Sequence, residues 1–109
     1  MNYKKNEIKQ YFKDFINDID KDTLNELIEN QELHHEAFNT DYYIIGTYEA
    51  KQWLSDKVFD VIEFIKEYEQ DNFGEVYTDL SNPEKVVNMY VYIIGEQITY
   101  EYYEECEAI

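Results

Sequence analysis

The sequence predicts a mainly α-helical protein, a small single-domain bundle of about four to five helices over residues 1–109. Three stretches carry this prediction, because around Phe12, Ile62 and Val87 apolar residues recur at intervals of three and four. A chain of this length can bury one core. Its apolar content of 44% and aromatic content of 17% are too high for a disordered chain.

The first two helices are predicted from residues 8–31. Thr23 and Glu26 have the spacing of a capping box, so a second short helix is expected to follow them and to run to about Gln31. The segment 34–41 (HHEAFNTD) is expected to be a loop. The apolar face of the first helix consists of Ile8, Tyr11, Phe12, Phe15, Ile16 and Ile19.

The tetrapeptide Tyr-Ile-Ile-Gly occurs at residues 43–46 and again at 92–95. In the first copy, Thr40 or Asp41 can cap a helix that reaches Leu54, and a strand at residues 42–45 is the alternative. The second copy also fits a hairpin, with a two-residue turn at Gly95-Glu96. Helical spacing that begins near residue 83 and continues through this glycine favours a helix. We expect two buried helical faces in which glycine permits close packing.

Clear start and stop signals bound the last two helices. Ser55 is expected to cap a helix that ends at Gly74, with Val58, Val61, Ile62, Ile65 and Tyr68 on its apolar side. The final helix is expected to begin at Ser81-Asn82-Pro83, where a capping side chain precedes a proline at the first helical position.

The charge of the chain is strongly negative. It has 25 acidic residues against nine basic ones, all of them lysine, which gives a formal net charge of −16. A surface of this kind repels nucleic acids and anionic membranes, so we expect direct binding to neither. Cys106 is the only cysteine and no apolar run is long enough to cross a bilayer, so we expect a cytoplasmic protein.

No residue pattern indicates a reaction or a metal site. Asp18, Asp20, Asp22 and Glu29 occupy positions 1, 3, 5 and 12 of an EF-hand-like loop, but Thr23 stands where the turn needs glycine. We therefore interpret these acids as helix-end residues. His34 and His35 lack further ligands at a suitable spacing, and the glutamates around Cys106 disfavour a nucleophilic thiolate. We expect no enzymatic activity, no catalytic residue, no metal and no cofactor.

Two groups of residues are candidates for binding a partner. The first is a row of carboxylates spaced for one helical stripe opposite the apolar face: Asp56, Asp60, Glu63, Glu67 and Asp71. The second is the C-terminal mixture of tyrosines, which favour binding surfaces, with glutamates: Tyr100, Tyr102, Tyr103, Glu101, Glu104 and Glu105.

Short length, strong acidity, absence of arginine and abundant tyrosine together resemble the small acidic proteins of phages and mobile elements that mimic DNA. The segments 38–54 and 71–89 also resemble an uncharacterised phage-borne family, which implies no function. The first resemblance implies a non-enzymatic inhibitor of a positively charged nucleic-acid-binding host protein, of the restriction, CRISPR or repair type. The alternative is an adaptor that binds a partner, or a second copy of itself as a homodimer, through a tyrosine-rich surface.

Overall fold

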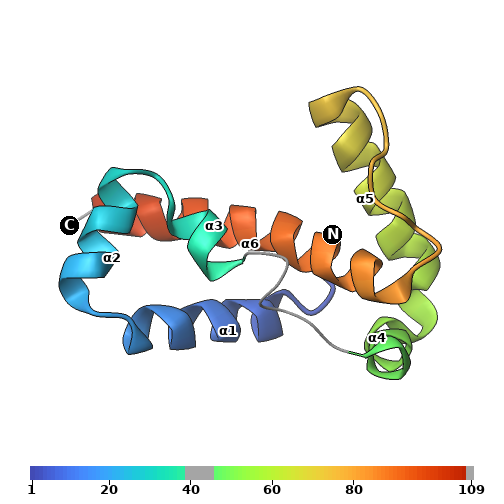
Figure 1. Ribbon diagram of the computed structural model, residues 1–109, viewed down its shortest axis with the longest axis horizontal. Coiled ribbons are helices and arrows are strands. Elements are labelled where there is room, and N and C mark those ends of the chain that lie inside the picture. The colour runs from blue at the N-terminus through green and yellow to red at the C-terminus, as the bar shows by residue number, and fades with distance from the viewer. Residues whose placement is uncertain (39–45, 108–109) are drawn as a thin grey trace.

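The computed structural model describes residues 1–38 and 46–107, and within them it contains helices and no strand. This confirms the predicted class, a small, mainly α-helical, single-domain bundle (Figure 1). The elements are α1 (Lys5–Asp18), α2 (Lys21–Glu29), α3 (Leu33–Ala37), α4 (Thr47–Leu54), the 3₁₀ turn η1 (Ser55–Lys57), α5 (Val58–Phe73) and α6 (Pro83–Glu107).

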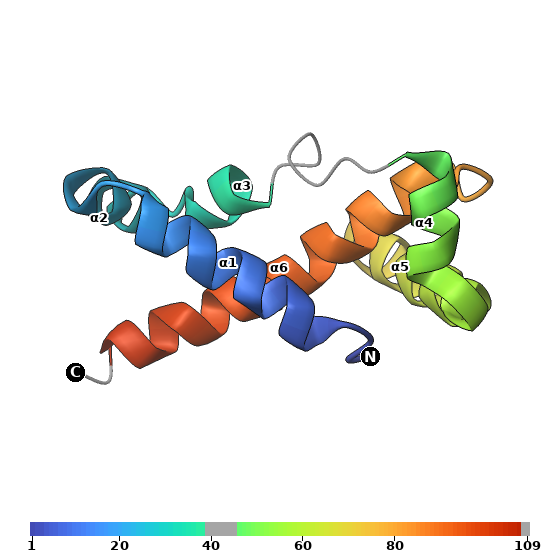
Figure 2. The ribbon, with the colours of Figure 1, turned by 90° about the horizontal axis from the view of Figure 1, so that it is seen from below.

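Helix α6 is the central element, and α1, α3, α4 and α5 all pack against it. Its 25 residues span about 37 Å at 1.5 Å per residue, close to the 40 Å longest extent of the molecule. Figure 2 shows α1 crossing α6, while α4 and α5 gather at the N-terminal end of α6. Because several helices cover it, α6 buries a wide apolar face, which includes Val86, Val87, Tyr90, Val91, Ile93, Ile94 and Ile98.

The chain before α1 is anchored in the core through Tyr3. The hydroxyl of the fully buried Tyr90 donates to the backbone oxygen of Tyr3 at 2.6 Å, and burial raises the pKa of Tyr90 to about 12. The hydroxyl of Tyr3 in turn donates to the backbone oxygen of Trp53. These bonds join the start of the chain to α4 and α6.

The second Tyr-Ile-Ile-Gly copy lies within α6, which confirms the helix and shows that the hairpin alternative was wrong. Gly95 permits close packing, as expected: a Cβ there would come closer than 3.0 Å to three ring carbons of Phe38. Most of the first copy, and its proposed caps Thr40 and Asp41, lie outside the described residues. Its Gly46 is the N-cap of α4, which begins at Thr47.

Several predicted element boundaries were wrong. Helix α2 begins at Lys21, because the side chain of Asp20 accepts a hydrogen bond from the backbone N–H of Thr23 at 3.3 Å and so caps the helix itself. It ends at Glu29, two residues before Gln31. Ser55 does not cap α5. It is the C-cap residue of α4, where its backbone N–H donates to the backbone oxygen of Lys51 and its φ of 49° turns the chain, and α5 begins at Val58 after η1.

The expected loop after α2 contains a short helix, α3, which places the fully buried Leu33 and Ala37 on one face against α6. Two of the predicted start and stop signals of helices are confirmed. Gly74 ends α5 with a left-handed φ of 81°. The side-chain oxygen of Asn82 accepts from the backbone N–H of Glu84 at 3.0 Å and so caps α6. None of the described helices is both long enough and apolar enough to cross a bilayer.

Candidate partner-binding surfaces

Helix α5 is held in place by its inner face, which buries Val61, Ile65 and the carboxylate of Glu69. Glu69 accepts from the backbone N–H groups of Tyr77 and Thr78 at 2.7 and 3.2 Å, and from the hydroxyl of Thr78. It thereby fixes the connection between α5 and α6. The sequence analysis did not single out Glu69 among the acids, although its position in phase with Val61 and Ile65 is a usable signal.

All five carboxylates of the predicted row are exposed. Asp56 lies on η1 and the other four on α5, on the side turned away from Val61 and Ile65. Glu63 has a partner, since its Oε1 lies 3.3 Å from the Nζ of Lys66. The row therefore presents largely unpaired negative charge, because three of its members have no hydrogen bond or ion pair within the described part of the chain: Asp60, Glu67 and Asp71.

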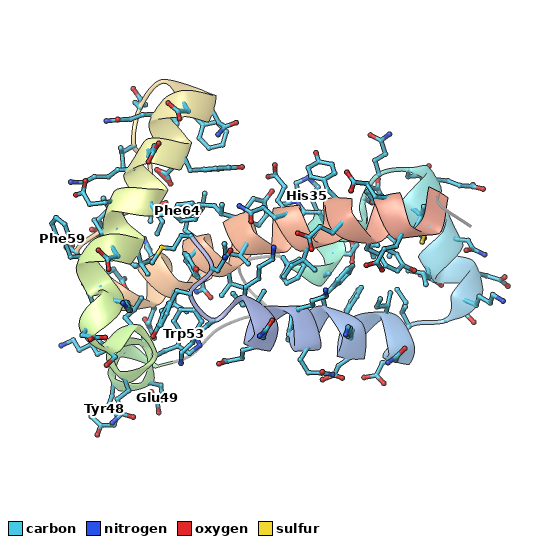
Figure 3. All side chains as sticks on the ribbon, turned by 180° about the vertical axis from the view of Figure 1, so that it is seen from behind. His35, Tyr48, Glu49, Trp53, Phe59 and Phe64 are labelled. Atoms are coloured by element: carbon cyan, nitrogen blue, oxygen red, sulfur yellow. The ribbon has the colours of Figure 1, made fainter. Side chains whose placement is uncertain are left out.

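An exposed aromatic residue flanks this row. Phe59 is 71% exposed and lies one helical turn before Glu63. Figure 3 shows Phe59 on the outer side of α5, whereas Phe64 points toward α6, where its ring lies 5.7 Å from that of Tyr90. Phe59 was not among the predicted binding residues, although a large apolar residue out of phase with the buried face is a detectable signal.

The residues of the predicted C-terminal surface do not form one exposed face in the structure. Tyr100 is 60% exposed, whereas the partly buried ring of Tyr102 packs edge-on against Phe12 of α1 at 5.5 Å. Tyr103 is partly buried beside Tyr100, with ring centroids 6.4 Å apart. Glu101 forms an ion pair of 2.8 Å with Lys5. Glu104 and Glu105 are exposed.

A pocket of about 400 Å³ lies between the α2–α3 segment and the C-terminal half of α6. Its walls include both histidines and two of the predicted tyrosines: His34, His35, Tyr92, Glu96, Tyr100 and Tyr103. The sequence analysis placed the histidines in a loop without a role. The helical turn of α3, which was not predicted, brings them to α6. His34 thereby contacts Tyr92, which lies 58 residues further along the chain.

Hydrogen bonds order the pocket walls. The Nε2 of His34 lies 3.0 Å from the backbone oxygen of Tyr92 and donates to it, while the hydroxyl of Tyr92 lies 3.1 Å from the Nδ1 of His35. Burial lowers the pKa of His34, against the opposing effects of that carbonyl and of Glu96. The hydroxyl of Tyr68 donates to the Oε2 of Glu96 at 2.8 Å, and burial together with this bond raises the pKa of Tyr68. Glu96 is thus a pocket carboxylate tied to α5.

The EF-hand-like acids do not lie in a loop. Asp18 ends α1, Asp20 caps α2 and Glu29 ends α2, so a helix occupies most of the stretch that would need to be a loop. Among the described residues, no group of three or more histidine, cysteine, aspartate or glutamate side chains is arranged to hold a metal ion.

No protein-family model, curated protein sequence or solved structure matches this chain.

Proposed function

We propose that this protein is a non-enzymatic inhibitor that binds a basic, nucleic-acid-binding host protein by acidic mimicry of DNA. The partner would be an enzyme of the restriction, CRISPR or repair type. The observation that carries the proposal is the exposed row on η1 and α5. Figure 1 supports it, because α5 projects away from α1, α2 and α3, where a cleft could receive it.

The spacing of the row suits a site that binds DNA phosphates. Carboxylates three or four residues apart on a helix are separated by about 4.5–6 Å along the axis, and successive phosphates of one DNA strand by about 3.4 Å, a spacing of the same order. Like charges at this spacing destabilise a helix by about 0.2–0.5 kcal/mol per pair, so helix stability does not explain the row. Binding to a basic cleft does, because phosphate contacts dominate the affinity of such clefts.

Competition with a labelled duplex tests the proposal. The partner is first isolated with the tagged protein, and displacement of the duplex from it is then measured. The test variant carries four amide substitutions: Asp56→Asn, Asp60→Asn, Glu63→Gln and Glu67→Gln. If each carboxylate contributes about 0.5–1 kcal/mol at low salt, this variant should bind roughly 30- to 1000-fold more weakly, with a shallower dependence on salt.

A matched control separates the row from overall charge. Four exposed acids of α1 and α2 changed to amides give the same net charge elsewhere: Asp14, Asp18, Asp22 and Glu29. The control should lose less than about tenfold in affinity, because charges beyond a Debye length are screened. Equal losses in the two variants, or failure of the wild-type protein to displace the duplex at any salt concentration, would refute a role for the row.

A second candidate is an adaptor or homodimer that uses exposed aromatic residues. Phe59 and Tyr100 are the observations that favour it, because both rings are more than half exposed and aromatic residues are enriched at interfaces. An aromatic interface should keep its affinity as salt rises, whereas an electrostatic mimic should lose it steeply. Sedimentation of Phe59→Ala and Tyr100→Ala against the wild type tests self-association directly.

A further inference from the structure

We infer that the pocket beside α6 binds the guanidinium group of an arginine side chain, which the basic partner presents. The inference deepens the proposed function, since it names a specific contact that the partner makes outside the acidic row. It rests on the proposed function only for the source of the arginine; the affinity of the pocket for a guanidinium is a separate property.

The size and lining of the pocket fit a side chain. Its volume of about 400 Å³ lies within the range of roughly 300–1000 Å³ typical of ligand sites. Rings from α6 contribute to its walls: Tyr92, Tyr100 and Tyr103. Aromatic faces attract cations, with an energy of about 0.5–2 kcal/mol.

The charge of the pocket selects a cation. Glu96 is the only carboxylate among the described residues that line it, and no lysine lies on the walls. One oxygen of Glu96 accepts from the hydroxyl of Tyr68, while its Oε1 has no hydrogen-bond partner in the described part of the chain. Burial lowers the pKa of His34, which disfavours a positive charge on that ring beside a bound cation.

A guanidinium suits this lining better than an ammonium. It is planar and weakly hydrated, so it can stack on a tyrosine ring while its N–H groups donate to a carboxylate. The lining residues Glu96 and Gln31 both carry side-chain oxygens that can accept such hydrogen bonds. Proteins that grip DNA expose many arginines for phosphate contacts, so the proposed class of partner supplies the ligand.

A titration with a small probe tests the pocket without any partner. Nα-acetyl-arginine amide is added to the ¹⁵N-labelled protein at constant ionic strength, and the citrulline analogue, neutral and of the same shape, serves as the control ligand. We expect saturable shifts at Tyr92, Glu96 and Tyr100, and citrulline should bind at least about fivefold more weakly, because it lacks the charge. Equal binding of the two probes, or shifts confined to the α5 row, would overturn the inference.

Two variants on α6 localise the effect. Glu96→Gln removes the charge but keeps an oxygen that can accept from Tyr68, and it should weaken arginine binding about fivefold. Glu84→Gln makes the same change at a half-exposed position in the first turn of α6, outside the lining, and should leave binding unchanged. Equal effects of the two substitutions would show nonspecific attraction and refute the site.

The duplex-displacement assay then tests the source of the arginine. If the partner fills the pocket, Glu96→Gln should displace the duplex about fivefold less well than Glu84→Gln does. A pocket that binds arginine in a protein unable to displace DNA would refute mimicry and leave the site standing. Unchanged displacement by Glu96→Gln would show that the partner does not use the pocket.

Discussion

At Gly95 the backbone of α6 lies close to the buried ring of Phe38. Gly95→Ala would place a Cβ closer than 3.0 Å to three carbons of that ring. Overpacking of this kind costs about 1–3 kcal/mol, which outweighs the roughly 1 kcal/mol that alanine gains over glycine inside a helix. Urea denaturation should therefore show a net loss of up to about 2 kcal/mol.

The effect of Gly95→Ala on stability should change sign when Phe38 is replaced by alanine. In a Phe38→Ala background the ring is absent, so Gly95→Ala should stabilise α6 by about 1 kcal/mol through helix propensity. If the substitution destabilises both backgrounds equally, the contact with Phe38 is not the reason for the glycine.

Protonation of His34 should lower the free energy of unfolding at mildly acidic pH. Burial lowers its pKa below the ordinary value of 6.5, so between the two values the unfolded chain binds more protons than the folded one. The stabilising contribution is fully present above pH 6.5 and is lost as the pH falls toward the lowered pKa. Glu96 and His35 act on the same ring with opposite sign, since Glu96 raises the pKa of His34 and His35 lowers it.

Thermal unfolding of the wild type and of His34→Gln across this range measures the effect. The wild type should lose melting temperature as the pH falls below 6.5, and the variant should lose less, because it keeps His35 but not the buried imidazole. Parallel curves for the two proteins would show that His34 does not titrate differently in the folded state.

At the scale of elements, Glu69 tests whether a buried carboxylate holds α5 to the connection that follows it. Glu69→Gln keeps the shape and one oxygen for the N–H groups of Tyr77 and Thr78, but it removes the charge that strengthens those bonds and places an N–H₂ group where the hydroxyl of Thr78 donates. The loss should be about 1–3 kcal/mol in chemical denaturation. Glu67→Gln, exposed on the same helix, should change stability by less than about 0.5 kcal/mol. Equal losses would contradict the role of Glu69.

The long helices were predictable because strong local signals bound them. Apolar spacing, Gly74 and Asn82-Pro83 are enough to define most of α5 and α6. Short α3 was not predictable, because its helical turn depends on burying Leu33 and Ala37 against α6, and no local signal reports that contact. Ser55 was misread for a similar reason, since a positive φ is dictated by the turn between two helices and not by the serine.

The candidate binding surfaces, like the helices, were predictable only where the signal is local in the sequence. Periodicity alone places the carboxylates of the row on one face, because that geometry belongs to a single helix. The pocket was beyond the sequence analysis, since it joins residues near 34 to residues near 96 through a tertiary contact. Of the pocket walls, only Tyr100 and Tyr103 were predicted as binding residues, and they were assigned to an open surface.

The net charge of −16 predicts how the whole molecule responds to ions. Raising sodium chloride from about 0.01 M to about 1 M shortens the Debye length from roughly 30 to roughly 3 Å, which screens the repulsion among the acids. A gain of about 1 kcal/mol would raise the melting temperature by roughly 4–8 °C.

Because α2 occupies the EF-hand-like stretch, Ca²⁺ and Mg²⁺ at matched ionic strength should give the same melting temperature. The Asp20→Asn variant keeps a capping side chain, so its melting temperature should also be the same in Ca²⁺ and in Mg²⁺. A rise specific to Ca²⁺ and lost in Asp20→Asn would mean that the acids of α1 and α2 assemble a cation site after all.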